Sequence, residues 1–179
     1  MSGLSIRLAS LADLAPIDEP EETGTTFEDN ARLKAHYYSA RSGLWTVAED
    51  SGLVVDALDG EPGVRSARFL RADATYPERF GEIYRRLDAH HDAPRTARFI
   101  AALASVENGA LIYETTGVVE GAIAEAPRGS GGFGYDPIFF YPPYGRTLAE
   151  VTEPEKIAVA HRGIAFRRFA EWIENHEER

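Results

Sequence analysis

The residues best suited to chemistry in this sequence are two pairs of carboxylates, Glu21 with Glu22 and Glu49 with Asp50, the second pair followed by Ser51. Mg²⁺ prefers carboxylate oxygens and usually binds through one or two of them together with substrate phosphates. A carboxylate can also orient or deprotonate an attacking water. The two pairs therefore indicate a metal-dependent hydrolytic site. The alternative is a solvated acidic turn beside an ordinary acidic loop.

Lys34 is the cation that we expect near these carboxylates. Because a helix turns by about 100° per residue, Lys34 shares one helix face with Phe27 and Asn30. An ammonium group on that face could bind a phosphate or the acidic turn. The alternative is a lysine whose stem lies along apolar residues while its charge reaches water.

A glycine-rich loop, Gly129 to Asp136, carries aromatic residues that could stack on a nucleotide base. No Gly-Lys-Ser/Thr follows it and it opens no helix, so it is neither a Walker loop nor a dinucleotide-binding fingerprint. The alternative is a turn packed by two core aromatics. The residues predicted here to contact a ligand are Phe133, Gly134, Tyr135 and Asp136.

Three potentially cationic side chains, Lys156, His161 and Arg162, lie near the last predicted helix. Such groups suit a phosphate or a carbonyl oxygen of a base. The alternative is a charged, solvated helix surface. Ser51 lacks the Gly-x-Ser-x-Gly context of a nucleophilic serine, which disfavours a serine hydrolase.

One helix must position the first of these groups. Thr25 and Glu28 have capping-box spacing, apolar residues follow at helical spacing, and Gly43 comes next as a stop. The pattern predicts a helix over about residues 27–42. It would place Lys34 in the middle of this helix.

The carboxylate pair Glu49 and Asp50 interrupts two short apolar runs within residues 45–58. This pattern predicts a strand, a tight acidic turn, and then a second strand or a short helix. The pair would then lie at the end of an element, and Asp50 would be a surface turn residue.

Several further elements follow. Asn108-Gly109 is the strongest short hairpin signal, and the apolar stripes and capping boxes elsewhere mark helices. The order predicts an α/β fold with a mixed sheet and flanking helices. The predicted segments are a helix from near Thr75, antiparallel strands at Thr96–Val106 and Ala110–Ile123, a short apolar run at Ile138–Phe140, and a terminal helix that starts at a capping box (Thr147 with Glu150, or Thr152 with Glu155) and carries Phe166, Phe169, Trp172 and Ile173.

Bulk composition restricts the class of protein. The chain has 179 residues, enough for one domain, and its net charge of −10 argues against a protein that coats a nucleic acid polymer. With no cysteine it cannot be a disulfide-stapled secreted module, so a cytoplasmic location is expected. It has no run of about 20 apolar residues, so no membrane partner is expected.

Taken in order, the motifs resemble the inosine/xanthosine triphosphate pyrophosphatase family. The resemblance covers about residue 3 to the C-terminus and is specific, because several separated motifs match. They are Glu21-Glu22-Thr23-Gly24, Thr26-Phe27, Asn30-Ala31, Lys34-Ala35, Asp50-Ser51-Gly52-Leu53, Pro62-Gly63, Ser66-Ala67-Arg68, Gly131 to Pro137, Glu155-Lys156 and His161-Arg162-Gly163.

This resemblance implies a homodimeric enzyme of two lobes around a central cleft. Its implied reaction is the Mg²⁺-dependent hydrolysis of ITP, dITP or XTP to the nucleoside monophosphate and pyrophosphate, which removes deaminated nucleotides from the pool. The implied roles are a general base at Asp50, metal ligands at Glu21 and Asp50, substrate contacts at Ser51 and Lys156, a base-stacking loop from Phe133 to Asp136, and base recognition by His161 and Arg162. Donors there could read a 6-oxo purine, whereas the amino group of adenine would leave them unpaired.

Two departures from the family bear on function. The resemblance starts after the family's first strand and its Thr/Ser-x-Asn-x-x-Lys turn, so we expect one pyrophosphatase domain, residues 1–179, N-terminally truncated relative to the family. Ala160 stands where the family commonly has serine, and Glu49 where it commonly has aspartate. Two alternatives remain: a degenerate nucleotide-binding or dimerisation module with little turnover, and a related phosphohydrolase of different base preference.

Overall fold

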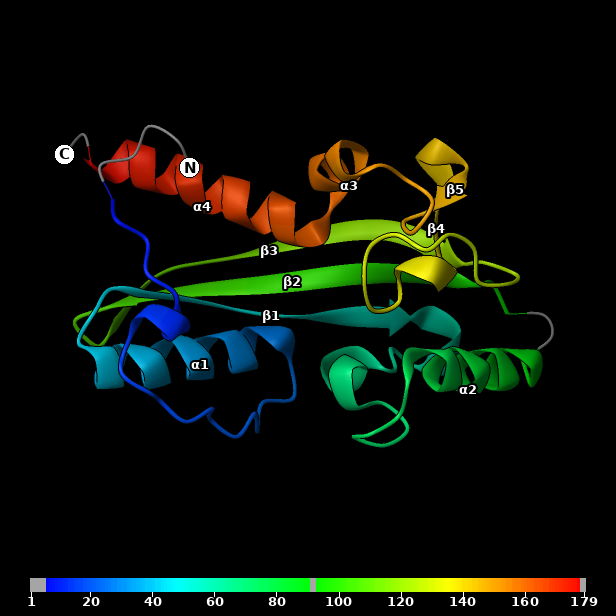
Figure 1. Cartoon of the computed structure of the whole chain (residues 1–179), viewed down its shortest axis with the longest axis horizontal. Helices are drawn as coiled ribbons and strands as arrows, with labels where there is room; N and C mark the ends of the chain where they lie inside the picture. Colours follow the sequence, from blue (N-terminus) through cyan, green and yellow to red (C-terminus); the bar gives the residue numbers. More distant parts are fainter. Residues whose placement is uncertain (1–5, 91–92, 178–179) are drawn as a thin grey trace.

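The computed structural model describes residues 6–90 and 93–177. In this part of the chain, five strands form one sheet in the order β1-β2-β3-β4-β5 (Figure 1). The strands are β1 (Thr46–Val55), β2 (Thr96–Glu107), β3 (Ala110–Ile123), β4 (Phe139–Tyr141) and β5 (Arg146–Thr147), and the α-helices are α1 (Phe27–Ser42), α2 (Tyr76–Asp88), α3 (Glu153–Val159) and α4 (His161–Glu177).

The prediction of an α/β fold with helices flanking a sheet is confirmed. Every strand pairing among the described residues is antiparallel, so the parallel part of the predicted mixed sheet is not found there. No helix in the described ranges is long and apolar enough to cross a membrane.

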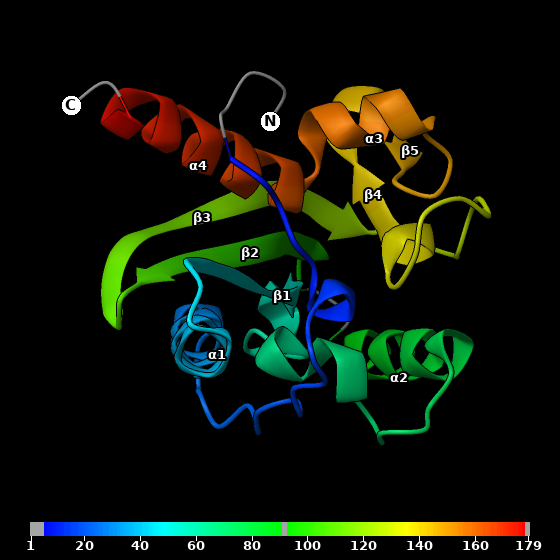
Figure 2. The same cartoon turned by 60° about the vertical axis from the view of Figure 1, so that its left-hand side comes forward.

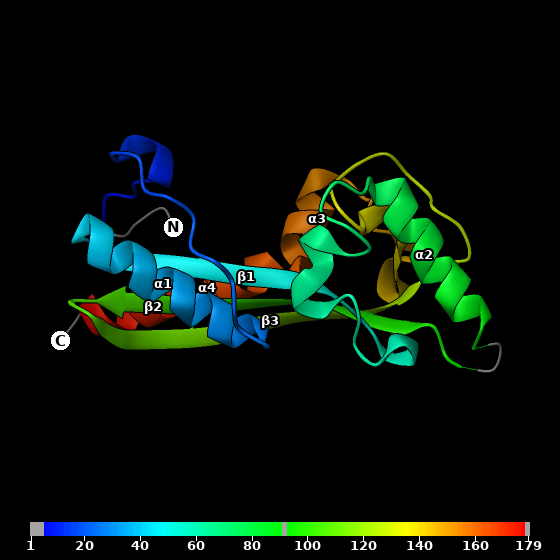
Figure 3. The same cartoon turned by 90° about the horizontal axis from the view of Figure 1, so that it is seen from below.

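Helices cover both faces of the sheet (Figure 1). α4 lies on one face, and α1 and α2 lie on the other, as the turned view in Figure 2 also shows. Seen from below in Figure 3, α1 and α2 occupy opposite ends of the long strands, and Figure 1 shows α3, β4 and β5 gathered at the α2 end. The elements thus form two groups along the sheet.

Strand β2 shows how the two faces are packed. Its even-numbered alanines, Ala102 and Ala104, pack against α1, while its odd-numbered Ala101 and Leu103 pack against α4. This alternation is the two-residue period of a strand. A third, larger core at the other end of the sheet joins α2 to β4.

Helix α1 begins and ends as predicted, but its cap is one residue later. Thr26, and not Thr25, is the N-cap, because its hydroxyl accepts a hydrogen bond from the backbone N–H of Asp29 at 3.1 Å. Gly43 ends the helix in the left-handed conformation, with φ of 69°. Asn108 and Gly109 also adopt positive φ in the confirmed hairpin between β2 and β3.

The predicted acidic turn between residues 45 and 58 is wrong. Residues 46–55 form one continuous strand, and Glu49, Asp50 and Ser51 lie in its middle, each paired with a residue of β2. A long antiparallel partner overrides the turn propensity of Asp, Ser and Gly, because each strand residue gains cross-strand hydrogen bonds and packing. Asp50 is consequently buried, with 8% of its surface exposed, and is no surface turn residue.

The predicted terminal helix is two helices. The chain leaves the helical conformation at Ala160, with ψ of 136°, so α3 and α4 are separate elements. The capping box of Thr152 and Glu155 starts α3 as predicted. Thr147 and Glu150 instead bond within a turn after β5, and Phe166 is exposed while Phe169 is buried.

Gly117 of β3 lets the start of α4 approach the sheet. A Cβ atom at this position would lie 2.1 Å from the backbone oxygen of His161 and 2.8 Å from the nitrogen of Ala165. We expect Gly117→Ala to lower the free energy of unfolding by ~2 kcal/mol, because backbone atoms of a packed helix must shift. Urea denaturation measures this change.

The matched control is Gly81→Ala in α2. Nothing lies within 4 Å of a Cβ added at Gly81, and alanine is the better helix former. The control should stabilise by ~0.5–1 kcal/mol. Equal destabilisation by both substitutions would contradict the close approach at Gly117.

Candidate active site

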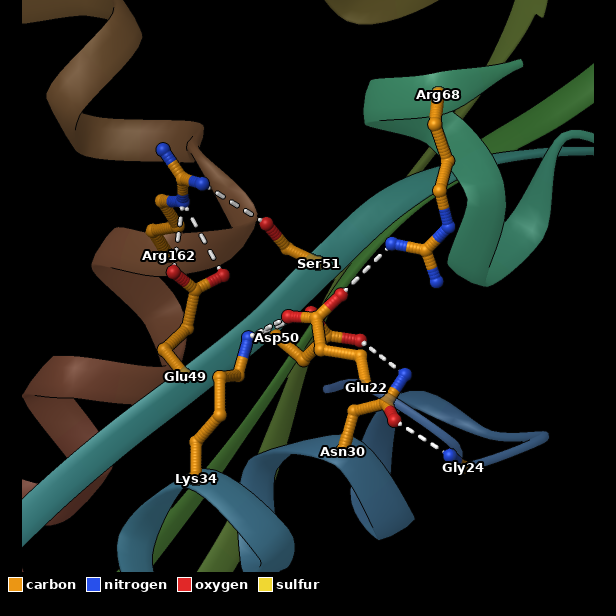
Figure 4. Close-up of polar contacts among 9 residues, drawn as sticks. All are labelled: Glu22, Gly24, Asn30, Lys34, Glu49, Asp50, Ser51, Arg68 and Arg162. Atoms are coloured by element: carbon orange, nitrogen blue, oxygen red, sulfur yellow. Dashed lines mark hydrogen bonds and ion pairs between the residues drawn. The ribbon is translucent and has the colours of Figure 1, made fainter. Parts of the chain in front are cut away.

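Strand β1 distributes the predicted site over both faces of the sheet. Asp50 points toward α1, where it contacts Asn30 and Lys34. Its neighbours Glu49 and Ser51 point toward α4, where both contact Arg162 (Figure 4). The alternation of side chains along a strand accounts for this division.

A hydrogen-bonded network holds Asp50 on the α1 face. The Lys34 Nζ lies 2.8 Å from Asp50 Oδ1, and the Asn30 Nδ2 donates to Asp50 Oδ2 at 3.2 Å. Asn30 is fully buried, and its Oδ1 accepts from the backbone N–H of Gly24 at 2.8 Å. The sequence pattern that places Asn30 and Lys34 on one helix face therefore delivers both to the same carboxylate.

Glu22 connects this network to Arg68. Its Oε1 lies 2.8 Å from Lys34 Nζ and its Oε2 lies 3.0 Å from a guanidinium nitrogen of Arg68, which follows β1 in the 3-10 helix Gly63–Arg68 (Figure 4). Glu21, the predicted metal ligand, is exposed one residue earlier.

No site role was predicted from the sequence for Arg68 or Asn30, and Glu22 was indicated only as the second member of an acidic pair. The only sequence signals for them were the Ser66-Ala67-Arg68 motif, the helix face shared with Lys34, and the second position of the acidic pair. None of these signals shows which residue reaches Asp50 in space.

Burial and charge set the pKa values of Asp50 and Glu22 in opposite directions. Burial raises the pKa of Asp50, and the hydrogen bond and charge of Lys34 only partly oppose it. Burial also acts to raise the pKa of Glu22, but Lys34 and Arg68 outweigh it and the net pKa is lowered. Two carboxylates whose environments separate their pKa values in this way suit distinct roles, with Asp50 the stronger base.

Phe133 and Lys156 form a second group with Asp136. Asp136 is buried and accepts from the backbone N–H of Phe133 at 2.7 Å, and its Oδ2 lies 2.5 Å from Lys156 Nζ. The ring of Phe133 is 60% exposed. Lys156 Nζ lies 4.7 Å and Arg162 Cζ 5.1 Å from its centroid, so an exposed aromatic face stands beside two cations.

Tyr135 and Gly134 are placed differently from Phe133. Tyr135 is buried, donates its hydroxyl hydrogen bond to the backbone oxygen of Ser66 at 2.8 Å, and packs edge-on against Tyr76. Gly134 has φ of 66°, which turns the chain between the exposed Phe133 and the buried Tyr135. Of the two aromatics in this loop, only Phe133 presents its ring to solvent.

His161 is largely buried at the start of α4. Its ring stacks on Phe99, with centroids 4.8 Å apart and planes 11° apart. Burial, aided by the charges of Arg162 and Lys156, lowers the pKa of His161 to about 3. The imidazole is therefore neutral near pH 7, which corrects its description as a potentially cationic group.

Comparison with known proteins places this chain in a family. Residues 1–172 match the model of the Ham1 family. The protein belongs to the Ham1 family. The dITP/XTP pyrophosphatase of Gloeobacter violaceus is 50% identical over 148 residues, which are 83% of this chain and 73% of that protein. The dITP/XTP pyrophosphatase of Geobacillus kaustophilus is 44% identical over 170 residues, 94% of this chain and 83% of that protein.

Solved Ham1 structures have the same fold. The Ham1 protein of Coxiella burnetii superposes with a TM-score of 0.85 at 42% identity, covering 88% of this chain and 81% of that one. The Ham1 protein of Staphylococcus aureus gives a TM-score of 0.86 at 33% identity, covering 93% and 85%. The resemblance inferred from the motifs is thus confirmed at the level of family and fold.

In this Ham1 family chain, predicted residues and the partners that the structure adds meet as two groups that share β1. Each group combines a carboxylate with cations, and the second adds an exposed aromatic ring. The first group consists of Glu22, Asn30, Lys34, Asp50 and Arg68, and the second of Glu49, Ser51, Phe133, Asp136, Lys156 and Arg162.

Proposed function

We propose that this protein hydrolyses the deaminated purine nucleoside triphosphates ITP, dITP and XTP to the nucleoside monophosphate and pyrophosphate. The observation that carries the proposal is the buried Asp50 carboxylate, whose pKa is raised and which Lys34 and Asn30 hold in one orientation. The names of the Ham1 relatives, dITP/XTP pyrophosphatases, support this substrate class.

The proposed reaction is attack of water on the α-phosphorus. Asp50 accepts a proton from the water while the water oxygen bonds to the α-phosphorus. The bond between the α-phosphorus and the oxygen that bridges the α- and β-phosphates breaks, and pyrophosphate leaves. Lys34 and Arg68 lie on the same side of β1 as Asp50 and supply positive charge for the phosphates. Each currently shares the carboxylate of Glu22, which keeps both cations beside the base.

A magnesium ion fits the donors on the α1 face. The carboxylates of Asp50 and Glu22 both lie 2.8 Å from the Lys34 ammonium, so two hard oxygen donors already converge on one positive charge. No group of three or more His, Asp or Glu placed to hold a metal occurs within the described ranges, and Mg²⁺ commonly uses one or two carboxylates plus substrate phosphates. From the family resemblance we propose Asp50 and Glu21 as its ligands, with Glu22, which lies beside Asp50 at the Lys34 ammonium, as a further oxygen donor. Bound there, Mg²⁺ would neutralise phosphate charge.

The second group is the proposed base site. Phe133 would stack on the purine, Lys156 and Asp136 would hold the loop against it, and Ser51, Gly134 and Tyr135 would shape the pocket. Arg162 and the neutral His161 would read the 6-oxo group. A base with a 6-amino group would leave these donors unpaired, which costs orders of magnitude in kcat/KM.

A cytoplasmic homodimer belongs to the same proposal. The dimer follows from the family resemblance, and the cytoplasmic location from the absence of cysteine in the sequence. Sedimentation equilibrium at several protein concentrations tests the dimer: one species of twice the chain mass supports it, and a monomer at all concentrations contradicts it.

The direct test is pyrophosphate release from ITP, dITP, XTP, GTP and ATP, with Mg²⁺ and with excess chelator. We expect turnover of the first three with kcat/KM at least ~100-fold above that of ATP, and none with chelator. Binding of ITP without pyrophosphate release would instead identify a nucleotide-binding module. Preferred turnover of GTP or ATP would indicate a phosphohydrolase of different base preference.

Substitution of Phe133 tests the stacking role. Phe133→Ala should raise KM for ITP about tenfold, because stacking of a base on an aromatic ring is worth ~1–3 kcal/mol. The unfolding free energy should hardly change, since the ring is 60% exposed. Steady-state kinetics with ITP measures KM. Phe166→Ala, which removes another partly exposed ring on α4, is the control and should leave KM unchanged.

A further inference from the structure

The guanidinium of Arg162 is held from two directions by the α4-facing residues of β1. Its Nε lies 3.2 Å from Glu49 Oε1 and 3.1 Å from Glu49 Oε2, and its Nη2 donates to Ser51 Oγ at 3.0 Å (Figure 4). Nη1 donates no hydrogen bond to any residue that the structure describes, and in Figure 4 it points away from both partners. The Nε and Nη2 sides of the planar guanidinium are thus occupied, and the N–H groups of Nη1 are left for a ligand.

The same side chain lies beside Phe133, the exposed ring of the proposed base site. Arg162 Cζ is 5.1 Å from the ring centroid. The guanidinium therefore lies beside the place proposed for the base, where its Nη1 could donate to the exocyclic 6-oxo oxygen of a purine. Arginine has many rotamers, so its direction here depends on what holds it.

We propose that Glu49 is a positioning residue that, together with Ser51, fixes Arg162 and thereby sets discrimination between 6-oxo and 6-amino purines. This inference rests on the proposed function and names the residue behind its specificity. The Glu49 side chain is mostly shielded from water, with 17% of its surface exposed against 44% for Arg162. Its carboxylate therefore makes a charge-assisted contact with Arg162 that solvent screens little. Ser51 contributes to the base site through Arg162, because its hydroxyl is engaged there.

The length of the Glu49 side chain matters for this contact. Glu49 and Arg162 lie on different elements, β1 and α4, and α4 is held against the sheet by the core in which its Ala165 and Leu103 of β2 take part. An aspartate in place of Glu49 would be one methylene shorter and could keep the charge without keeping both carboxylate contacts to Nε. Glu49→Asp should therefore restore only part of what Glu49→Gln loses.

The test compares Glu49→Gln and Glu49→Asp with the wild type, using kcat and KM for ITP and for ATP. We expect Glu49→Gln to lower kcat/KM for ITP about tenfold, mainly through KM, while kcat/KM for ATP is unchanged, so that the ITP/ATP ratio falls about tenfold. Glu49→Asp should lie between. Equal losses for both nucleotides, or an unchanged ratio, would overturn the proposal, because a merely structural role has no base preference.

The control variant is Glu114→Gln. Glu114 holds Arg32 through two hydrogen bonds of 2.7 and 3.1 Å on the exposed surface. The Glu114→Gln substitution therefore removes the charge of a similar glutamate–arginine pair outside the site. It should leave the ITP/ATP ratio unchanged, and thermal unfolding should show all variants folded.

Equilibrium binding separates this proposal from the proposed function. If the wild type releases no pyrophosphate, the proposed hydrolysis fails. The Kd values of ITP and ATP, measured by calorimetry, still test whether Glu49 positions Arg162. A Kd ratio that falls about tenfold in Glu49→Gln supports the positioning role without turnover. A wild type that binds both nucleotides equally, or neither, overturns it.

Discussion

Asp50→Asn should lower kcat for ITP by about 1000-fold, since removal of a general base typically costs 10²–10⁴ in rate. Asn has nearly the same shape as Asp and can still accept the hydrogen bond from Asn30, but it cannot take a proton from water. Steady-state pyrophosphate release with saturating ITP measures the loss.

The fold should survive this substitution. Lys34 keeps its ion pair with Glu22, so no buried cation is left without a partner, and the unfolding free energy should change by no more than ~1 kcal/mol. The expected stability does not follow from an exposed position, because Asp50 is buried in a strand. Loss of activity in step with loss of folding would contradict a catalytic role.

The control for Asp50→Asn is Asp56→Asn. Asp56 follows β1, where it pairs with Arg98 and accepts from the Thr96 hydroxyl on the exposed surface. It should leave kcat unchanged. A similar loss from both variants would show that the activity depends on β1 in general and not on the Asp50 carboxylate.

The fold could be predicted from sequence where local signals and tertiary packing agree. Helix α1 has a cap, a stripe and a glycine stop that all indicate one range, and the Asn108-Gly109 hairpin has residue types that readily take two consecutive positive φ angles. In both cases the short-range signal is the physical cause of the structure.

Strand β1 could not be predicted, because its cause is not local. Glu49, Asp50 and Ser51 have turn propensity, and only the ten-residue register with β2 holds them in extended conformation. The mistake has a functional consequence. In a turn these side chains could share one surface, whereas in a strand they divide between α1 and α4.

The candidate site shows the same limit. The family motifs identified Asp50, Lys34 and Arg162, but pairing partners depend on distances between elements far apart in sequence. Motif order alone could not show that Arg162 is held by Glu49, nor that Glu22 joins Lys34 to Arg68. Burial of His161, which makes it neutral, likewise depends on its stacking against Phe99 of β2.

Lys34→Met should be the most destabilising of the substitutions considered and should also reduce kcat about 100-fold. Lys34 is the cation between Asp50 and Glu22, with 17% of its side chain exposed. Removing one partner of a buried ion pair leaves an uncompensated charge, which costs ~3 kcal/mol. Urea unfolding at pH 7 measures this loss. Arg32→Met, which breaks an exposed pair with Glu114, should cost no more than ~1 kcal/mol.

The pH dependence of Lys34→Met separates lost charge from lost packing. Burial already raises the pKa of Asp50, and without Lys34 that pKa rises further, so the folded variant binds a proton more tightly than the unfolded chain does. Its stability therefore falls as pH rises from the unfolded value of about 4 through the raised folded value. The lowered pKa of Glu22 acts in the same sense, because its stabilising pair with Lys34 is lost from the wild type as pH falls. The difference between wild type and variant should thus be largest at pH 7 and shrink toward pH 4. A difference that is constant over this range would show that the methylene packing of Lys34, and not its charge, stabilises the site.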